Sequence, residues 1–274
     1  MSGAPRPRAL SIAGSDPSGG AGIQADLKTF SALGVYGMTA ITAVTVQNTT
    51  GVSGFEAIAP AIVADQIRAV ATDVGVDAAK TGMLADAAIV EAVADAIAET
   101  GVPPLVVDPV SVSKHGHALL APDAVASLRE RIVPLATLVT PNLPEAAVLA
   151  GHQVDTRDDM RRAAEAILSL GAAAVLVKGG HLPRAEAAAD LFVDGRTEAW
   201  VSAPWIDTPN THGTGCTLSA AIAARLAIGD DLRPAVEAGK RFVTEAIRAS
   251  LAIGDGIGPV DPLWSIPTAD ASGA

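Results

Sequence analysis

Short runs of β-branched and apolar residues alternate along this chain with longer segments rich in alanine. The short runs have the length of buried strands, and the longer segments carry apolar residues three and four positions apart, which is typical of helices. The expected strands are 8–14, 38–46, 78–82, 105–110, 138–141 and 174–177, and the expected helices are 23–33, 60–74, 85–99, 122–131, 158–170, 216–227 and 234–250, with a short helix around Glu145. This alternation predicts an α/β fold, with a mostly parallel central sheet and helices on both faces.

A small hairpin is also expected near the carboxyl-terminal third of the chain. The runs 190–193 and 198–201 flank Asp194 and Gly195, and an Asp-Gly pair is typical of a tight hairpin turn. No change of composition marks a linker, so we expect a single domain over 8–260. The ends, 1–7 and 261–274, are expected to be flexible.

Composition argues against several classes of protein. Hydrophobic residues make up 49% of the chain and charged residues 18%, which is typical of a globular domain. Apolar runs stop well short of the roughly 20 residues that a membrane span needs, and no secretory signal is visible. The net charge of −11 argues against a general nucleic-acid or membrane-surface binder. The single cysteine, Cys216, excludes an internal disulfide, so we expect a cytoplasmic protein.

The segment 208–221 joins a glycine loop to a helix. Gly213 and Gly215 lie among small hydroxylated residues, and a good helix former begins at Cys216. The first turn of a helix has unpaired N–H groups and a positive dipole end, so a glycine-lined entry lets an anion approach closely. This predicts a phosphate site, although a helix start whose glycines only turn the chain fits the segment equally well. The chain has no Gly-x-x-x-x-Gly-Lys-Ser/Thr loop, so a nucleotide must be bound by another device.

Polar residues of chemical interest follow the predicted strands. Ligands bind beyond the carboxyl ends of the strands in folds of this kind, so we expect these side chains to share a site. They are Asp16, Asp26, Gln47, Lys80, Asp108, Asn142, Glu145 and Lys178.

Two of these residues are candidate metal ligands. Asp108 and Glu145 could together hold Mg²⁺, which prefers oxygen ligands and keeps part of its water shell beside a phosphate. The alternative is that Asp108 caps a turn and Glu145 merely favours a first helical turn. Lys178, flanked by glycine, is either a phosphate ligand or an ordinary surface lysine.

Other residues have properties suited to a ring-shaped substrate and to catalysis. Gln47 and Asp26 together offer a hydrogen-bond donor and acceptors that could bind the polar groups of a heterocycle. Met83 is either an apolar wall of the pocket or a core residue. Cys216 could be a base or nucleophile whose pKa is lowered by the helix N-terminus, or an inert buried thiol. The histidines at positions 115, 117 and 181 lack a zinc-binding spacing and are interpreted as loop residues.

Seven segments, in order, resemble the hydroxymethylpyrimidine/phosphomethylpyrimidine kinases of thiamine biosynthesis, a family of the ribokinase-like superfamily. They are 13–29, 44–49, 80–84, 107–110, 140–146, 177–181 and 212–217. The resemblance covers about residues 8–260. It implies a ribokinase-like three-layer α/β/α sandwich, ATP as co-substrate, Mg²⁺ and a homodimer. It also implies two successive phosphorylations, of 4-amino-5-hydroxymethyl-2-methylpyrimidine and then of its monophosphate.

The same resemblance assigns roles to individual residues by motif. The pyrimidine would be bound by Gly14, Asp26, Gln47, Met83 and Val110, ATP by Asn142, Lys178, Thr211 and Gly213, and Mg²⁺ by Asp108 and Glu145. Gly213, Thr214, Gly215 and Cys216 would form an anion hole, with Lys178 as a further catalytic group. Cys216 stands where related sugar kinases carry an aspartate base.

Three alternatives to this function are considered. The nearest is a pyridoxal kinase of the same superfamily. A sugar kinase fits less well because Cys216 replaces the expected carboxylate. A non-catalytic pyrimidine-binding protein would not need the anion hole.

The chain departs from the family pattern at 111–117. A Lys-Ser-Gly-Asp-like turn is expected there, and the sequence has Lys114, His115, Gly116 and His117. The segment 181–189 is our candidate for a lid.

Overall fold

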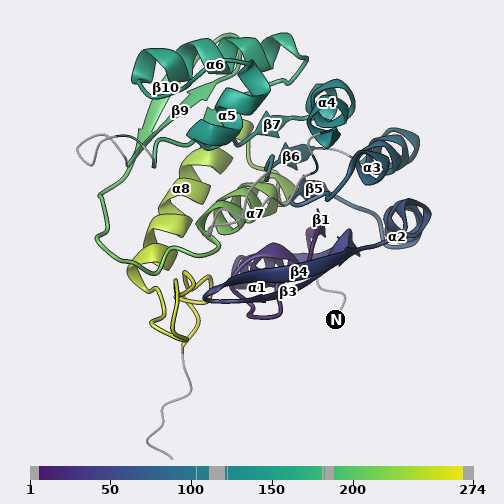
Figure 1. Ribbon diagram of the computed structural model, residues 1–274, viewed down its shortest axis with the longest axis horizontal. Coiled ribbons are helices and arrows are strands. Elements are labelled where there is room, and N and C mark those ends of the chain that lie inside the picture. The colour runs from purple at the N-terminus through teal and green to yellow at the C-terminus, as the bar shows by residue number, and fades with distance from the viewer. Residues whose placement is uncertain are drawn as a thin grey trace, which may run out of the picture.

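The computed structural model describes residues 6–102, 104–110, 121, 123–180, 182 and 188–267. Its central element is an eight-stranded sheet with the order β10-β9-β8-β7-β6-β5-β1-β2 (Figure 1). The strands are β1 (Arg8–Ala13), β2 (Tyr36–Ile41), β5 (Ala78–Thr81), β6 (Leu105–Val107), β7 (Leu138–Val139), β8 (Val175–Val177), β9 (Ala189–Val193) and β10 (Glu198–Ser202). Neighbouring strands from β2 to β8 are parallel, and the β8–β9 and β9–β10 pairs are antiparallel.

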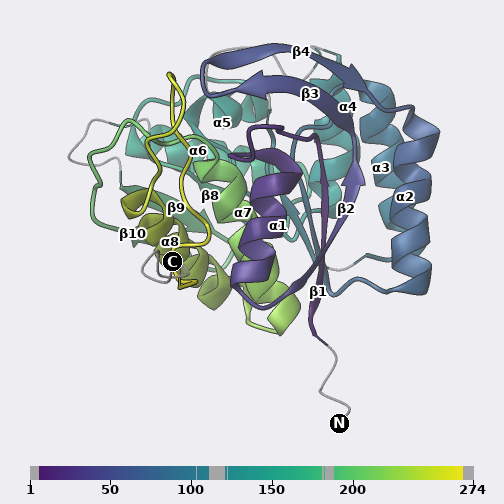
Figure 2. The same ribbon diagram turned by 90° about the horizontal axis from the view of Figure 1, so that it is seen from below.

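Helices cover both faces of this sheet (Figures 1 and 2). One face carries α1 (Gly22–Ala32), α7 (Thr214–Ile228) and α8 (Leu232–Arg248). The other carries α2 (Pro60–Asp73), α3 (Ala87–Thr100), α4 (Ala124–Ser127), α5 (Leu143–Ala150) and α6 (Arg157–Ser169). A π-helical turn (Leu128–Ile132) and a 3₁₀ turn (Val133–Leu135) follow α4. The three-layer α/β/α sandwich predicted from the sequence is confirmed.

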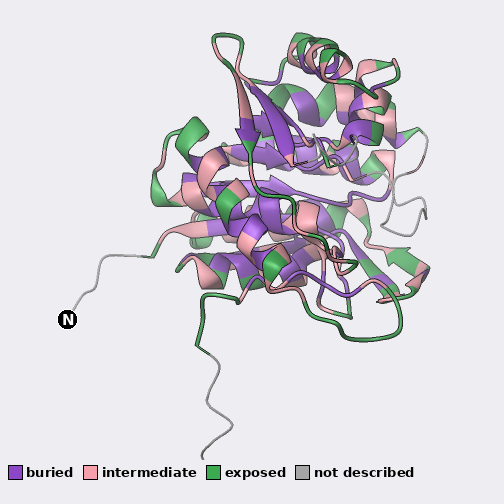
Figure 3. Ribbon diagram, turned by 90° about the vertical axis from the view of Figure 1, so that its left-hand side faces the viewer, coloured by how far each residue is buried: buried purple, intermediate pink, exposed green. Residues whose placement is uncertain are grey.

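Two hydrophobic clusters, one on each face of the sheet, hold these layers together. Successive strand residues point to opposite faces, so Ala9 and Val106 belong to one cluster while Leu10 and Val107 belong to the other. The central strands are buried throughout (Figure 3). This arrangement makes the carboxyl edge of the sheet a rigid base for the polar residues that follow the strands.

A second, two-stranded sheet departs from the prediction of one strand over 38–46. The chain turns at Thr42, which separates β2 from β3 (Ala43–Asn48), and β3 pairs with β4 (Gly51–Ala57). Thr42 is fully buried, its hydroxyl donates to the carbonyl of Met83 at 2.6 Å, and its N–H donates to Ala13 at 3.1 Å. These contacts, with the last residue of β1 and with the loop after β5, end β2. Figure 2 shows the β3–β4 hairpin across the end of the sheet where β1 ends.

The hairpin predicted over 190–201 forms as β9 and β10, with the Asp194 carboxylate accepting hydrogen bonds from the N–H groups of Arg196 and Thr197. It extends the main sheet, because β9 also pairs with β8. In the part of the chain that the structure describes, no helix is long and apolar enough to cross a membrane.

Candidate active site

A cleft of about 750 Å³ opens where the parallel strands end. Its walls come from the loops after β1, β5, β6 and β8, from the first turns of α5 and α7, and from β3 of the hairpin. Every residue assigned to the site from the sequence, except Asp26, lines this cleft. These residues are Gly14, Gln47, Met83, Asp108, Val110, Asn142, Glu145, Lys178, Thr211, Gly213, Thr214, Gly215 and Cys216.

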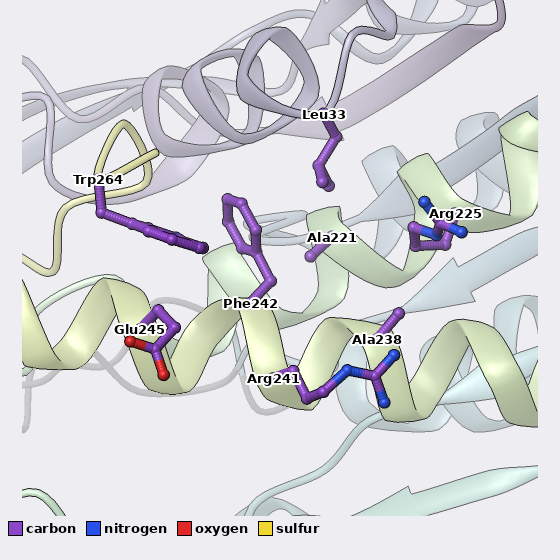
Figure 4. A pocket seen from close by; sticks show the side chains of 8 residues that line it. All are labelled: Leu33, Ala221, Arg225, Ala238, Arg241, Phe242, Glu245 and Trp264. Carbon is purple, nitrogen blue, oxygen red and sulfur yellow. The ribbon is translucent and has the colours of Figure 1, made fainter. Parts of the chain in front are cut away.

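A smaller groove of about 190 Å³ lies between α1, α7, α8 and Trp264 (Figure 4). Phe242 and Trp264 pack there with ring centroids 5.9 Å apart, and Arg225 at its edge is paired with Asp230. None of its lining residues lines the large cleft. The large cleft, which holds the site residues expected from the sequence, is therefore the candidate active site.

The first turn of α7 forms one wall of the cleft. Gly213 is the N-cap of α7, with φ of +79°, and a Cβ on it would lie 1.7 Å from the carbonyl oxygen of Gly20. Only glycine allows this left-handed turn and this close approach of two loops. Because the first N–H groups of a helix have no partner within it, the turn Thr214 to Cys216 can bind an anion from the cleft. A Cβ on Gly215 would lie 3.4 Å from Lys178 Nζ, which places this turn beside a cation.

Lys178 lies between two buried carboxylates. Its Nζ donates to Asp108 Oδ1 at 2.9 Å and lies 3.7 Å from Glu145 Oε2. Asp108 also accepts hydrogen bonds from the hydroxyls of Thr140, at 3.3 Å, and Ser219, at 3.4 Å. Glu145 forms a capping box at the start of α5 with Asn142, whose N–H donates to Glu145 Oε2 at 2.8 Å. The phosphate and metal ligands expected from the sequence are thus in contact.

The charges of this cluster follow from burial and from its own contacts. Burial raises the pKa of Glu145 to about 7; Lys178 opposes this shift, and the charge of Asp108 adds to it. Burial also disfavours the ionised form of Asp108, but Lys178 and Lys80 hold the pKa of Asp108 below its ordinary value. For Lys178, burial opposes the charge, yet Asp108 and Glu145 raise its pKa. The contacts therefore favour the charged forms of Lys178 and Asp108, while burial favours the protonated form of Glu145.

Of the two interpretations of Cys216, the surroundings of the thiol favour the neutral form over a pKa lowered by the helix N-terminus. Burial raises the pKa of this thiol to about 11, although Lys80 favours the thiolate and the N–H of Gly22 donates a hydrogen bond to the sulfur. Desolvation outweighs both contacts, because the thiolate loses more from leaving water than it gains from one cation and one N–H. These surroundings favour a neutral thiol at physiological pH, although Cys216 is only partly buried, and they disfavour a base role that requires a standing thiolate.

This conclusion predicts how Cys216 reacts. Alkylation by iodoacetamide, followed by mass spectrometry, should become about tenfold faster with each pH unit from 7 to 10 without a plateau, because only the thiolate reacts. Cys216 is the sole cysteine of the chain, so the mass change is unambiguous. Cys216→Ser should lower kcat less than about tenfold, since serine keeps a hydrogen-bonding group there. A plateau in the alkylation rate near pH 8 would show instead that the site generates a thiolate.

Asp26, assigned to direct contact with the pyrimidine, lies beneath the cleft. Its side chain is fully buried on α1, accepts a hydrogen bond from Ser11 at 2.5 Å, and pairs with Lys80 Nζ at 3.1 Å. Lys80 is itself fully buried, although it lines the base of the cleft. Burial raises the pKa of Asp26, which Lys80 opposes. Asp26 thus holds Lys80 in place and does not face a ligand.

The buried Asp26–Lys80 pair carries a prediction about stability. Lys80→Met should reduce the free energy of unfolding by about 3–5 kcal/mol, because it leaves the Asp26 carboxylate buried without its cation. Asp26→Leu combined with Lys80→Met should recover most of that loss, since two apolar side chains can fill the same space. Urea unfolding of the three proteins tests this. A double variant no more stable than Lys80→Met alone would contradict it.

Sequence reasoning missed other residues of the cleft. His212 lies beside Gln47 and forms a buried pair with Asp16, which the sequence did place at the site, and Asp190 pairs with Lys240 at 2.7 Å at another edge. An apolar recess is formed by Trp205, Ile206, Leu218, Val243 and Ile247. Only His212, next to Gly213, carried a signal in the sequence. The histidines at 115, 117 and 181, the departure at 111–117 and most of the lid candidate 181–189 lie outside the described residues.

Comparison with known proteins agrees with this geometry. A family model described as phosphomethylpyrimidine kinase matches residues 16–261, which is most of the chain. The chain belongs to this family. A hydroxymethylpyrimidine/phosphomethylpyrimidine kinase of Streptomyces coelicolor is 53% identical over 260 residues, covering 95% of this chain and 96% of the relative. One from Rhizobium meliloti is 55% identical over 251 residues, covering 91% and 94%.

Solved structures share the fold as well. The ADP complex of Bacillus subtilis pyridoxal kinase superposes with a TM-score of 0.86 at 42% identity, covering 94% of this chain and 97% of that one. Members of the phosphomethylpyrimidine kinase family and a pyridoxal kinase therefore share this architecture, which confirms the ribokinase-like fold expected from the resemblance.

Proposed function

We propose that this kinase transfers a phosphoryl group from ATP to the hydroxymethyl group of 4-amino-5-hydroxymethyl-2-methylpyrimidine, and then phosphorylates the monophosphate to the diphosphate, in thiamine biosynthesis. The observation that carries this proposal is that one cleft holds both halves of such a site. Lys178 and the first turn of α7 lie in the same cleft as Gln47, Met83 and Val110. The relatives named for this activity support it.

The pyrimidine is assigned to the end of the cleft under the hairpin. A Cβ on Gly14 would lie 3.1 Å from Met83 Sδ, so the absence of a side chain at Gly14 lets Met83 pack closely against this loop at the wall of the cleft. Gln47 lines the same end from the hairpin. A planar ring would stack against Met83, and the amide of Gln47 would face the polar edge of the ring.

ATP is assigned to the other end. Lys178 and the α7 N-terminus would bind its phosphates, with Asn142 and Thr211 beside them, and the apolar recess around Trp205 would hold the base. Phosphoryl transfer demands little covalent chemistry from the protein, so positioning and charge stabilisation carry the rate. The neutral thiol of Cys216 would orient the substrate hydroxyl. As the bond from the hydroxyl oxygen to the γ-phosphorus forms, the bond to ADP would break and the hydroxyl proton would pass to an oxygen of the transferred phosphoryl group.

Mg²⁺ is proposed to bind with ATP at Asp108 and Glu145. The described residues contain no group of three or more His, Cys, Asp or Glu that could hold a metal. Two buried carboxylates nevertheless fit this ion, because Mg²⁺ takes one or two from the protein and completes its shell with water and phosphate oxygens. Burial is the main cause of the raised pKa of Glu145, and the charge of Asp108 adds to it, which a cation between the two carboxylates would offset. When bound, the ion would neutralise charge on the phosphates.

The raised pKa of Glu145 predicts how stability depends on pH without nucleotide. From pH 4.5 to about 7 the folded protein keeps a proton that the unfolded chain releases, so the free energy of unfolding should fall as pH rises. The fall should reach about 3 kcal/mol and end above pH 7. Urea unfolding at pH 5, 6, 7 and 8 measures it, and Glu145→Gln should remove most of this slope.

Asp159→Asn is the matched control for this measurement. Asp159 occupies the same capping-box position in α6 but is less buried, with 16% of its side chain exposed against 7% for Glu145, and its hydrogen bond from the Thr156 hydroxyl lowers its pKa. Its contribution to stability is lost only as pH falls through that low pKa, so this variant should keep the wild-type slope between pH 5 and 8. Equal slopes in wild type and Glu145→Gln would contradict the assignment.

The protein is further proposed to be a cytoplasmic homodimer. On the outer face of the hairpin Val44 is 50% exposed and Val46 64% exposed. A two-stranded sheet is marginally stable alone, and a second copy could cover these β-branched residues. Sedimentation equilibrium would measure the oligomeric state, and a monomer at micromolar concentration would refute the dimer.

A phosphorylation assay tests the function directly. The purified protein is incubated with ATP and Mg²⁺ and with the pyrimidine, its monophosphate or pyridoxal, and the products are identified by mass. Diphosphate formation is the expected result. Turnover of pyridoxal alone would establish the second candidate, which the similarity to a solved pyridoxal kinase favours, and no turnover would leave a binding protein.

A further inference from the structure

Gln47 lies within a line of polar side chains whose other members have no assigned role. His212 Nε2 lies 2.8 Å from Asp16 Oδ2 and 3.3 Å from the amide of Gln47. The other end of that amide lies 3.5 Å from Thr45 Oγ1, and the Thr45 hydroxyl donates to the carbonyl of Ser15 at 2.9 Å. Asp16 and His212 are almost fully buried, at 1% and 4% exposure. The direction of each hydrogen bond in this line can be worked out from its two ends.

At the first end, Asp16 is an acceptor only. Its carboxylate already accepts hydrogen bonds from the N–H groups of Ser18, Gly20 and Ala21 and from the Ser18 hydroxyl. Burial opposes its ionisation, but the bonds from His212 and Ser18 hold the pKa of Asp16 below its ordinary value. An ionised carboxylate offers no proton, so His212 must donate through Nε2–H.

That proton decides which end of the Gln47 amide faces His212. With the amide nitrogen on that side, two N–H groups would face each other 3.3 Å apart, which is no hydrogen bond. A half-turn of the amide leaves its shape unchanged and puts the carbonyl oxygen beside Nε2–H. The donor–acceptor pattern therefore favours the oxygen.

The second end of the line agrees with this orientation. The amide nitrogen of Gln47 then lies 3.5 Å from Thr45 Oγ1. Because the Thr45 hydroxyl gives its proton to Ser15, its oxygen is free to accept. The one Nε2–H of His212 is then shared between the Asp16 carboxylate at 2.8 Å and the Gln47 carbonyl oxygen at 3.3 Å. The Gln47 amide donates one N–H to Thr45, and its other N–H is left for the cleft that this side chain lines.

We propose that His212 is a positioning residue that fixes the amide of Gln47, so that Gln47 offers an N–H donor to a ring nitrogen of a heteroaromatic substrate. The identity of that ring as the aminopyrimidine rests on the proposed function. His212 is itself fixed on both sides, since its N–H donates to Gly258 and its carbonyl accepts from Val260. A Cβ on Gly20 would lie 2.5 Å from its ring, so the ring has little room to turn.

A kinetic double-mutant cycle tests this with His212→Phe, Gln47→Met and the two combined. His212→Phe keeps a ring but frees the amide to turn, and should raise the KM for the pyrimidine about 10-fold to 100-fold with kcat changed less than about fivefold. In the Gln47→Met background the same change should alter KM less than about twofold. His212→Gln, whose amide N–H can reach the position of Nε2, should restore most of the affinity.

A second measurement needs no variant of His212 and no substrate. The long-range ¹H–¹⁵N spectrum of the wild-type protein should show His212 with its proton on Nε2. A bare Nε2, KM effects of the two substitutions that simply add, or a fall in kcat with KM unchanged would each overturn the proposal. If the wild type does not turn over the pyrimidine, the assignment of the ring is refuted, while the spectrum still decides how His212 orients Gln47.

Discussion

Lys178→Met is expected to lower kcat/KM by at least about 10³-fold. The Nζ of Lys178 lies between Asp108 and Glu145 and beside the first turn of α7, which is where the transferred phosphoryl group is assigned. Charge that develops on phosphate oxygens in such a position is stabilised by a preorganised cation, and removing one comparable group costs about 10²-fold to 10⁵-fold in related systems. Steady-state kinetics with varied ATP measures the loss. It should fall mainly on kcat, because the charge grows in the transition state.

Lys240→Met is the matched control for this prediction. Lys240 also lines the cleft, is similarly buried, and is paired with a single carboxylate, Asp190, at 2.7 Å. Both variants leave a buried carboxylate without its cation, so both should lose stability. Only Lys178→Met removes the charge beside the proposed anion hole, and its kcat/KM should be at least about 100-fold lower than that of Lys240→Met. If both variants lost the same factor in kcat/KM, the effect of Lys178→Met would come from a changed shape of the cleft and not from the lost charge.

Much of the fold could be predicted because most of its elements are specified locally. The glycines after α3 and α5 and the Asn142 cap of α5 are local signals, and the alternation of strands and helices implies the layers. The break between β2 and β3 has no such signal. The residues on both sides of Thr42 favour a strand, and the turn is made by contacts with Met83 and Ala13, which are distant in the sequence.

The strand β4 was missed for a related reason. Gly51, Ser53 and Gly54 have low β propensity, and this strand exists because it pairs with β3. The hairpin over the cleft is thus a product of tertiary structure. Since the hairpin carries Gln47, the sequence could predict that residue as a ligand without predicting the element that positions it.

The sequence indicated which residues share the site, but it did not indicate how deeply each is buried or whether each is ionised. Asp26 lies three residues after Ile23 and four before Phe30, so it shares the buried face of α1, and this spacing could have shown that it points inward. For Cys216 the position at a helix N-terminus suggested a low pKa, whereas the pKa depends mainly on burial among groups from other strands. Such desolvation is a property of the assembled site.

Gly213→Ala is expected to abolish activity, with a loss of more than about 10³-fold in kcat/KM. The φ of Gly213 is +79°, and a methyl group there would lie 1.7 Å from the carbonyl oxygen of Gly20. The loops of Gly20 and Gly213 must separate to admit it, which moves the unpaired N–H groups of α7 away from Lys178. An error of about 1 Å in the position of catalytic groups can cost about 10²-fold by itself, and the anion hole supplies several donors at once.

Gly229→Ala separates this effect from ordinary glycine strain. Gly229 ends the same helix with φ of +105°, and no described atom lies within 4 Å of a Cβ built on it. Alanine there should cost about 1–2 kcal/mol of stability through backbone strain and leave kcat/KM within about twofold. Circular dichroism would establish that both variants fold, and a crystal structure of Gly213→Ala should show α7 displaced at its first turn. Full activity in a folded Gly213→Ala protein would mean that the α7 N-terminus does not bind the transferred phosphate, and the charge would then be stabilised by Lys178 and its carboxylate neighbours alone.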